Sequence, residues 1–185
     1  MRQDHQPERR FFLLASGAAA IALTSAGCSR GAAIERQLEL ASFGDALKEM
    51  ERLAKLGTMR QSAAWSWAQT IHHCAQSIEF SMRGFPAPRS AVFQHTLGAA
   101  AFSVFSWRGR MSHDLQEPIP GAPLLDAHAD PAAALQRLRT AVADFQAFDK
   151  ALQPHFAYGA LSKKDYEHAH AMHLANHFSA FDTPA

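Results

Sequence analysis

Apolar side chains recur every three or four positions along several stretches of the chain, which is the spacing of one helix face. The pattern predicts helices over residues 42–57, 65–83, 91–107 and 131–152, and a last helix that begins after Ser162. No stretch of the sequence alternates between apolar and polar residues for long enough to predict a sheet. We therefore expect an all-α domain over residues 42–181, with four main helices and an additional one, most simply a helix bundle.

The stretch 91–107 is apolar nearly all round, so a buried helix is expected there, with Gly98 allowing close packing. A segment with three prolines, two glycines and no periodic stripe follows at 108–129. It predicts a long ordered loop, and loops of this length are often functional. Asp130 and Pro131 then suit the cap and the first position of the next helix.

The first residues resemble an export signal. A polar start ends in Arg9-Arg10, and an uncharged apolar run of about 16 residues follows. That run is shorter than the roughly 20 residues of a membrane-spanning helix and suits the hydrophobic region of a signal peptide. The twin arginine before Phe11 resembles a Tat signal, with an ordinary Sec signal as the alternative. Residues 1–27 are therefore expected to direct export to the periplasm.

The end of this signal leaves two forms of the mature protein open. The residues SAGC at 25–28 resemble a lipobox with serine where leucine is usual. Cys28 would then be either a lipidated residue or the unmodified first residue of a free periplasmic protein. Residues 28–41 are expected to form a tether to the helical domain. The two cysteines, Cys28 and Cys74, predict no disulfide framework, and Cys74 is interpreted as a small buried apolar residue.

Composition narrows the classes of partner. The chain has 185 residues, of which 48% are hydrophobic and 19% charged, as in an ordinary globular domain. Its formal charge is +1, and it falls to zero without residues 1–27. This balance argues against nucleic acid, whose phosphates need a basic face. A membrane is expected only through a lipid anchor at Cys28, and a homodimer stays open. Histidine stands out, with 11 copies.

Several of these histidines share one face of the last predicted helix. His173 and His177 are one turn apart, so they point about 40° apart and lie about 6 Å apart along the axis. Side chains at this spacing can meet at one metal ion. His170 falls in the same stripe, whereas His168 points to the other side. The spacing indicates a metal site, with surface histidines as the alternative.

A third ligand must come from another helix, because two residues of one helix cannot hold a catalytic metal alone. His72 and His73 in the predicted helix 65–83 are the candidates. His73 points roughly away from the main apolar stripe of that helix and His72 lies between the two faces, so the residues alone leave both open.

This arrangement resembles the DinB-like superfamily, also called YfiT-like, which has HxxxH on the last helix and one histidine on the second. The strings HCAQSIEFSM, GFP, PIPGAP and PHFAYG resemble an uncharacterised domain-of-unknown-function branch of it, over about residues 42–180. The resemblance implies a four-helix bundle in which His73, His173 and His177 bind a divalent metal. His170 would support the site or, like His72, serve as an alternate ligand. Zinc, nickel, iron and manganese all accept imidazole ligands.

Relatives in that superfamily include enzymes that transfer low-molecular-weight thiols, hydrolases and isomerases. The first hypothesis is therefore a metal-dependent enzyme, a transferase or hydrolase of an unknown small molecule, because three imidazoles leave a metal an open position. The alternative is a non-catalytic exported domain that binds metal or acts as a scaffold for a partner.

The catalytic residues stay unknown, because no convincing general base accompanies the three ligands. His155 and Tyr158, just before the last helix, are candidates for a pocket at the mouth of the bundle. His95, His113 and His128 have no partner spacing and are interpreted as loop or turn residues.

Overall fold

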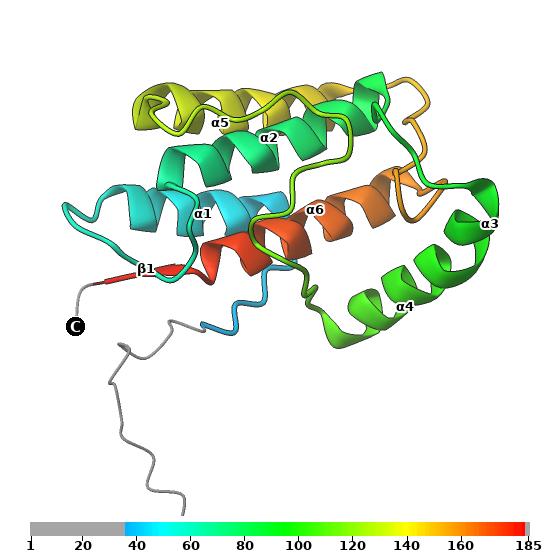
Figure 1. Cartoon of the computed structure of the whole chain (residues 1–185), viewed down its shortest axis with the longest axis horizontal. Coiled ribbons are helices and arrows are strands. Elements are labelled where there is room, and N and C mark those ends of the chain that lie inside the picture. The colour runs from blue at the N-terminus through cyan, green and yellow to red at the C-terminus, as the bar shows by residue number, and fades with distance from the viewer. Residues whose placement is uncertain (1–35, 184–185) are drawn as a thin grey trace, which may run out of the picture. The chain divides into compact units, whose positions relative to one another are not determined.

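Helices dominate the fold in the computed structural model, which describes residues 36–183. In chain order the elements are α1 (Phe43–Ala54), β1 (Arg60–Gln61), α2 (Trp67–Arg83), α3 (Ala91–Phe93), the π-helical η1 (Gln94–Gly98), α4 (Ala99–Arg108), α5 (Pro131–Ala147), α6 (Lys163–Phe178) and β2 (Phe181–Asp182) (Figure 1). The all-α expectation is confirmed, whereas the DinB-like four-helix bundle stays a prediction. The expected export signal, residues 1–27, and Cys28 lie outside the described residues.

Helix α2 packs against α5 on one side and α6 on the other, and α1 packs against α6 (Figure 1). A capping box fixes the start of α2: the Ser66 hydroxyl accepts from the Gln69 N–H, and the Gln69 side chain accepts from the Ser66 N–H. Four helices, α1, α2, α5 and α6, supply the buried core. Its large side chains are Phe43, Met50 and Leu53 of α1, Ile71 and Ile78 of α2, Leu138, Val142 and Phe145 of α5, and Tyr166, Met172, Leu174 and Phe178 of α6. Each such side chain contributes roughly 1.5–3 kcal/mol by leaving water.

Helix α5 begins at the predicted residue and ends before the predicted end. The Asp130 side chain accepts from two backbone N–H groups of the first turn, and proline follows it. The helix ends at Ala147, short of the predicted end at residue 152, because Phe148 adopts an extended backbone. The Lys163 ammonium donates to the Phe148 carbonyl over 2.7 Å, which satisfies an acceptor at this early end.

The prediction of a buried helix over residues 91–107 is right about the helix and wrong about its burial. No residue of α3 or α4 is buried, and Trp107 is 86% exposed. Gly98 is the buried position of the segment, because a Cβ there would lie 1.9 Å from the Ala157 carbonyl oxygen. This helical segment therefore meets the rest of the fold in close backbone contact, at the edge of the molecule (Figure 1).

Two short strands that the sequence analysis did not predict join distant parts of the chain. β1 and β2 pair antiparallel, with Arg60 opposite Asp182. The Arg36 guanidinium donates to the Phe181 carbonyl over 2.7 Å, and the Phe181 side chain is fully buried. The segment after α1 and the segment after α6 are thus held together below the helices.

Residues 109–130 contain no helix or strand, which confirms the predicted loop. The loop crosses α2 and α6 (Figure 1) and is bound to both. The Gln76 amide of α2 donates to the Pro123 carbonyl over 3.2 Å, and the Asn176 amide of α6 donates to the His113 carbonyl over 3.4 Å. A segment without regular structure is therefore fixed over two helices.

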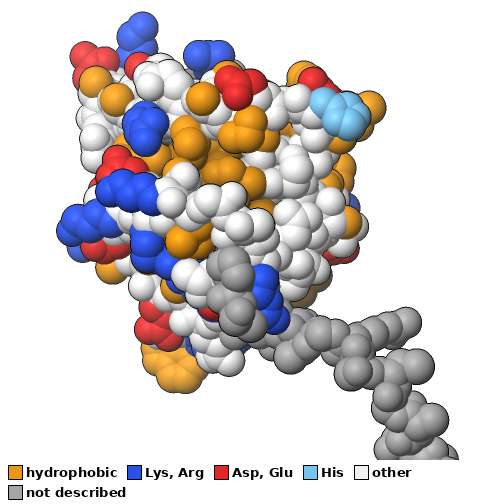
Figure 2. Space-filling view, turned by 90° about the vertical axis from the view of Figure 1, so that its left-hand side faces the viewer, with side chains coloured by type: hydrophobic (Ala, Val, Ile, Leu, Met, Phe, Trp, Pro, Cys, Tyr) orange, Lys and Arg blue, Asp and Glu red, His pale blue; other side chains and the backbone are white. Residues whose placement is uncertain are grey.

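The surface carries both signs of charge. On the face at the left of Figure 1, hydrophobic side chains gather near the centre, and Lys, Arg, Asp and Glu side chains lie around them (Figure 2). Over residues 36–183, none of the helices has the length and apolar character needed to cross a membrane.

Candidate metal centre

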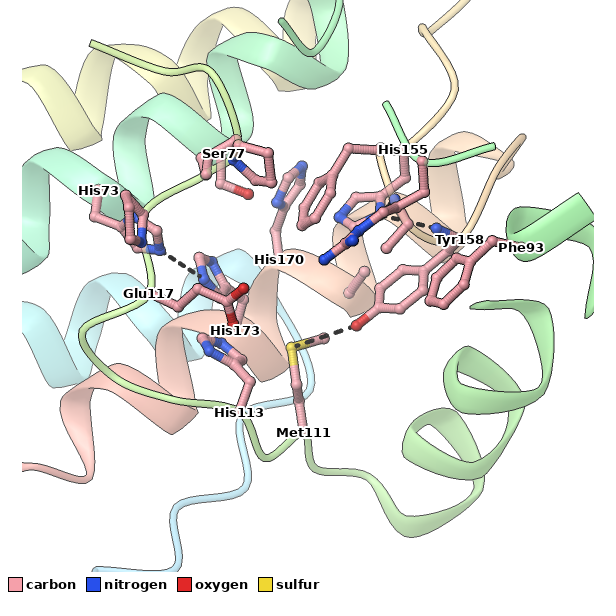
Figure 3. Close-up of a pocket in the computed structure, with 17 residues that line it drawn as sticks. His73, Ser77, Phe93, Met111, His113, Glu117, His155, Tyr158, His170 and His173 are labelled. Carbon is pink, nitrogen blue, oxygen red and sulfur yellow. Dashed lines mark hydrogen bonds between the residues drawn. The ribbon is translucent and has the colours of Figure 1, made fainter. Parts of the chain in front are cut away.

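Three histidine side chains from two helices meet between α2 and α6. His173 and His177 lie one turn apart on α6, and His73 lies on α2. One ring nitrogen of each lies within 4.8 Å of the other two, and the Nε2 atoms of His73 and His173 are 3.2 Å apart (Figure 3). The structure thus brings together the three residues that the superfamily resemblance names, and the set could hold a metal ion.

Helix α6 places its histidines in the interior of the fold. Its start is set by the Ser162 hydroxyl, which accepts from the Asp165 N–H over 3.1 Å. The side chains of α6 are buried on nearly every side, and His177 is 1% exposed. His73 is 2% exposed on the facing helix. His173 is half-buried between them, so none of the three is a fully exposed surface histidine.

Burial keeps the three imidazoles neutral. The pKa of His73 is lowered to about 3, chiefly because burial penalises its charged form and secondly through repulsion from His113. Burial, followed by the neighbouring histidines, also holds the pKa values of His173 and His177 well below the usual 6.5. Metal ions bind the neutral imidazole, so these rings are in the binding form at neutral pH.

Unpartnered nitrogens in the centre fit a divalent cation. His177 Nε2 is buried and has no hydrogen-bond partner among the described residues, whereas His73 faces His173 with Nε2 and its Nδ1 is the nitrogen without a partner. Such groups are uncommon in folded proteins and cost stability. Nitrogens bound to one ion at about 2.1 Å lie at most about 4.2 Å apart, so a small side-chain movement would close this set around an ion. Imidazole donors alone do not choose among zinc, nickel, iron and manganese.

The chain matches, over residues 32–184, the family described as protein of unknown function (DUF1569). It is a member of this family. No curated protein and no solved structure matches it. The match spans the whole expected helical domain, residues 42–181, so all three histidines lie inside the DUF1569 region.

In this DUF1569 domain His72, the neighbour of His73, is turned away from the candidate metal centre and toward α5. Its Nδ1 lies 3.2 Å from Nη1 of Arg137, and it accepts this bond because a guanidinium only donates. The same guanidinium holds the Glu79 carboxylate through two bonds of 2.9 Å. Arg137 thus occupies His72 Nδ1 and forms a salt bridge with Glu79, and the role of His72 as an alternate ligand stays a prediction.

His170 lies between the core and the pocket described below. Its ring centroid lies 5.9 Å from that of Phe43, 5.6 Å from that of Phe145 and 5.4 Å from that of Tyr166. Burial lowers its pKa to about 3, and its Nε2 has no hydrogen-bond partner among the described residues. His170 is therefore a neutral ring outside the set of three, near enough to His173 to help lower its pKa.

A pocket of about 230 Å³ opens beside the three histidines (Figure 3). Histidines, two charged residues and apolar side chains share its lining, which includes His73, His113, His155, His170, His173, Arg89, Glu117, Phe93, Met111 and Tyr158. A small molecule in this pocket would touch two of the three candidate ligands.

The two pocket candidates from the sequence, His155 and Tyr158, lie in this lining. His155 Nδ1 accepts the backbone N–H groups of Ala157 and Tyr158, each over 3.2 Å, so the ring proton is on Nε2. The imidazole stacks on the Tyr158 ring with centroids 4.2 Å apart. Burial lowers the pKa of His155 to about 3 and raises that of Tyr158 to about 12. Both groups are neutral hydrogen-bond donors at pH 7.

Sequence reasoning missed two pocket residues of the loop. His113 was interpreted as a loop residue without a partner, yet its ring centroid lies 5.1 Å from that of His173 and 5.0 Å from that of His177. Glu117 brings a carboxylate to the same pocket (Figure 3). The length of the loop was the one available signal, because helical spacing rules do not connect a loop residue to a helix.

Trp65 packs on the centre just before α2. Its ring is nearly parallel to that of His177, at 3° with centroids 6.2 Å apart, and its centroid lies 5.0 Å from that of His73. No pattern in the sequence predicts this contact. An aromatic wall next to the imidazoles helps to exclude water from them.

Proposed function

We propose that this DUF1569 protein is an exported metal-dependent enzyme, a transferase or hydrolase of small molecules. His73, His173 and His177 bind its divalent ion. The observation that carries the proposal is that two of the three, His73 and His173, lie in the wall of a pocket of about 230 Å³. Metal sites that only stabilise a fold are closed, whereas catalytic sites keep a position open to substrate. The resemblance to the DinB-like superfamily supports the same reading.

The pocket favours a small substrate with an anionic or polar group. Its volume of about 230 Å³ is below the roughly 300–1,000 Å³ of pockets for drug-sized ligands. Arg89 offers a positive charge to a carboxylate or phosphate, and His155 Nε2–H donates to an oxygen. The Glu117 carboxylate accepts a proton from a bound group. A divalent ion, when bound, supplies Lewis-acid polarisation of the reacting atom.

Export is the second part of the proposal, and it rests on the sequence alone. Residues 1–27 carry the Tat-like arginine pair and the apolar run of a signal peptide. The mature domain then works in the periplasm, free or held to the membrane by a lipid on Cys28. Nucleic acid is not among its partners, and self-association as a homodimer is compatible with this location.

Elemental analysis of the purified mature protein tests the metal site. We expect about one divalent ion per chain in the wild type and little in His73→Ala or His173→Ala. His72→Ala is the matched control, because it removes the adjacent histidine, which is bound to Arg137, and should keep the ion. A wild-type protein that binds no divalent ion at micromolar concentration would end the proposal.

A second measurement separates an enzyme from the non-catalytic alternative. Azide added to the Co²⁺-loaded protein should change its visible spectrum, because an open position on the ion admits a small anion. A spectrum that does not respond to azide would favour a closed site that only stabilises the fold.

A further inference from the structure

His113 brings a fourth imidazole to the same centre. Its ring centroid lies 5.1 Å from that of His173 (Figure 3) and 5.0 Å from that of His177. Within the set of His73, His173 and His177, the centroids lie 4.7 to 5.0 Å apart. The loop therefore holds the His113 ring beside the α6 histidines but outside the set whose ring nitrogens lie within 4.8 Å of one another, so ligation requires the ring to move inward.

The hydrogen bonding of His113 leaves a nitrogen lone pair free. Its Nδ1 lies 2.9 Å from the Asp114 carbonyl oxygen, which can only accept, so the ring proton is on Nδ1. Its Nε2 then carries the lone pair and is buried, with no hydrogen-bond partner in residues 36–183. One ring nitrogen bonded to a backbone carbonyl and the other free is the arrangement that orients metal-binding histidines.

Contacts on both sides hold this part of the loop in place. The Asn176 amide donates to the His113 carbonyl from between the two histidines of α6. Further along, the Gln76 amide of α2 binds the Pro123 carbonyl, and Ile119 is 5% exposed within the core. The position of His113 is therefore a property of the fold.

We propose that His113 is a fourth protein ligand, bound to the divalent ion through Nε2, and this rests on the metal site of the proposed function. Four protein ligands saturate a tetrahedral ion, as cysteines and histidines do in structural zinc sites. An ion that takes five or six ligands keeps positions for a substrate. In a working enzyme His113 therefore favours nickel, iron or manganese over zinc, and it ties the loop that carries Glu117 to the ion.

Nuclear magnetic resonance of the mature protein labelled with ¹⁵N-histidine counts the ligands directly when Zn²⁺, a diamagnetic probe, is added. We expect the Nε2 resonances of four rings to move in the wild type and of three in His113→Ala. Zinc affinity should fall about tenfold or more in that variant. His128→Ala removes an exposed histidine of the same loop and should leave the count and the affinity unchanged.

Each outcome decides between the two proposals. Three responding rings in both wild type and His113→Ala would overturn ligation by His113 and leave the metal site standing. A loss of affinity with three responding rings in the wild type would also overturn it, and would make His113 a positioning residue. If no ring responds in the wild type, the metal site itself is refuted and this inference with it.

Discussion

Mild acid should destabilise the metal-free protein, because its buried histidines are neutral in the fold. His170 has a pKa of about 3 there, caused by burial among aromatic rings, against about 6.5 in an unfolded chain. As the pH falls through 6.5, the unfolded chain takes up a proton that the folded chain does not. The free energy of unfolding therefore falls with pH until about pH 3, where the folded ring is protonated too.

The size of the effect follows from the number of such rings. Between pH 7.5 and 5.5, one histidine with these two pKa values costs about 1.4 kcal/mol. Burial also lowers the pKa values of His73 and His155 to about 3 and those of His173 and His177 well below 6.5. His73, His155 and His170 together cost about 4 kcal/mol, against a typical free energy of unfolding of about 5–15 kcal/mol, and His173 and His177 act in the same direction.

Urea unfolding followed by circular dichroism, with a chelator present, measures this dependence at pH 7.5, 6.5 and 5.5. His170→Leu removes one neutral ring and keeps a similar side-chain volume. Between pH 7.5 and 5.5, the free energy of unfolding of this variant should therefore decrease by about 1.4 kcal/mol less than that of the wild type. His128→Leu, at an exposed position, should keep the wild-type dependence. A wild-type urea midpoint that is the same at pH 7.5 and 5.5 would refute the reasoning.

Two further tests concern the fold and the signal. Gly98→Ala should lower thermal stability by a few kcal/mol, because its Cβ would meet the Ala157 carbonyl oxygen at 1.9 Å, whereas Gly44→Ala, with its nearest contact at 3.6 Å, should not. Equal melting temperatures of Gly98→Ala and the wild type would contradict the close contact. Replacing both Arg9 and Arg10 by lysine should leave precursor in the cytoplasm if the signal is of the Tat type, and normal processing on immunoblots would assign it to the Sec type.

Periodic apolar spacing predicted the helices well where one face of a helix meets the core. Phe43 and Met50 of α1 and Leu138 of α5 follow that spacing, and all three are buried. The same reasoning failed for residues 91–107, because apolar composition does not tell whether another layer is available to cover a helix. Val104 is 50% exposed for this reason.

The candidate centre could be predicted in part. The separation of His173 and His177 is a consequence of helical geometry, so spacing was enough to place them together. The choice between His72 and His73 needed the superfamily resemblance, because His73 points roughly away from the apolar stripe, His72 lies between the two faces, and neither position by itself predicts a ligand. His113 could not be predicted, because tertiary contacts such as that of Asn176 set the path of its loop.

The packing of Trp65 on His177 and His73 gives the centre an optical reporter of its own. An indole in contact with two imidazoles loses fluorescence when a paramagnetic ion binds between them, and a diamagnetic ion leaves this route of quenching closed. The other two tryptophans do not pack on the candidate ligands: Trp67 is buried in the core at 7% exposure and Trp107 is 86% exposed, so these two emit at different wavelengths. Intrinsic fluorescence of the unmodified protein can therefore follow the arrival of nickel, iron or manganese in real time, without a chromogenic substrate.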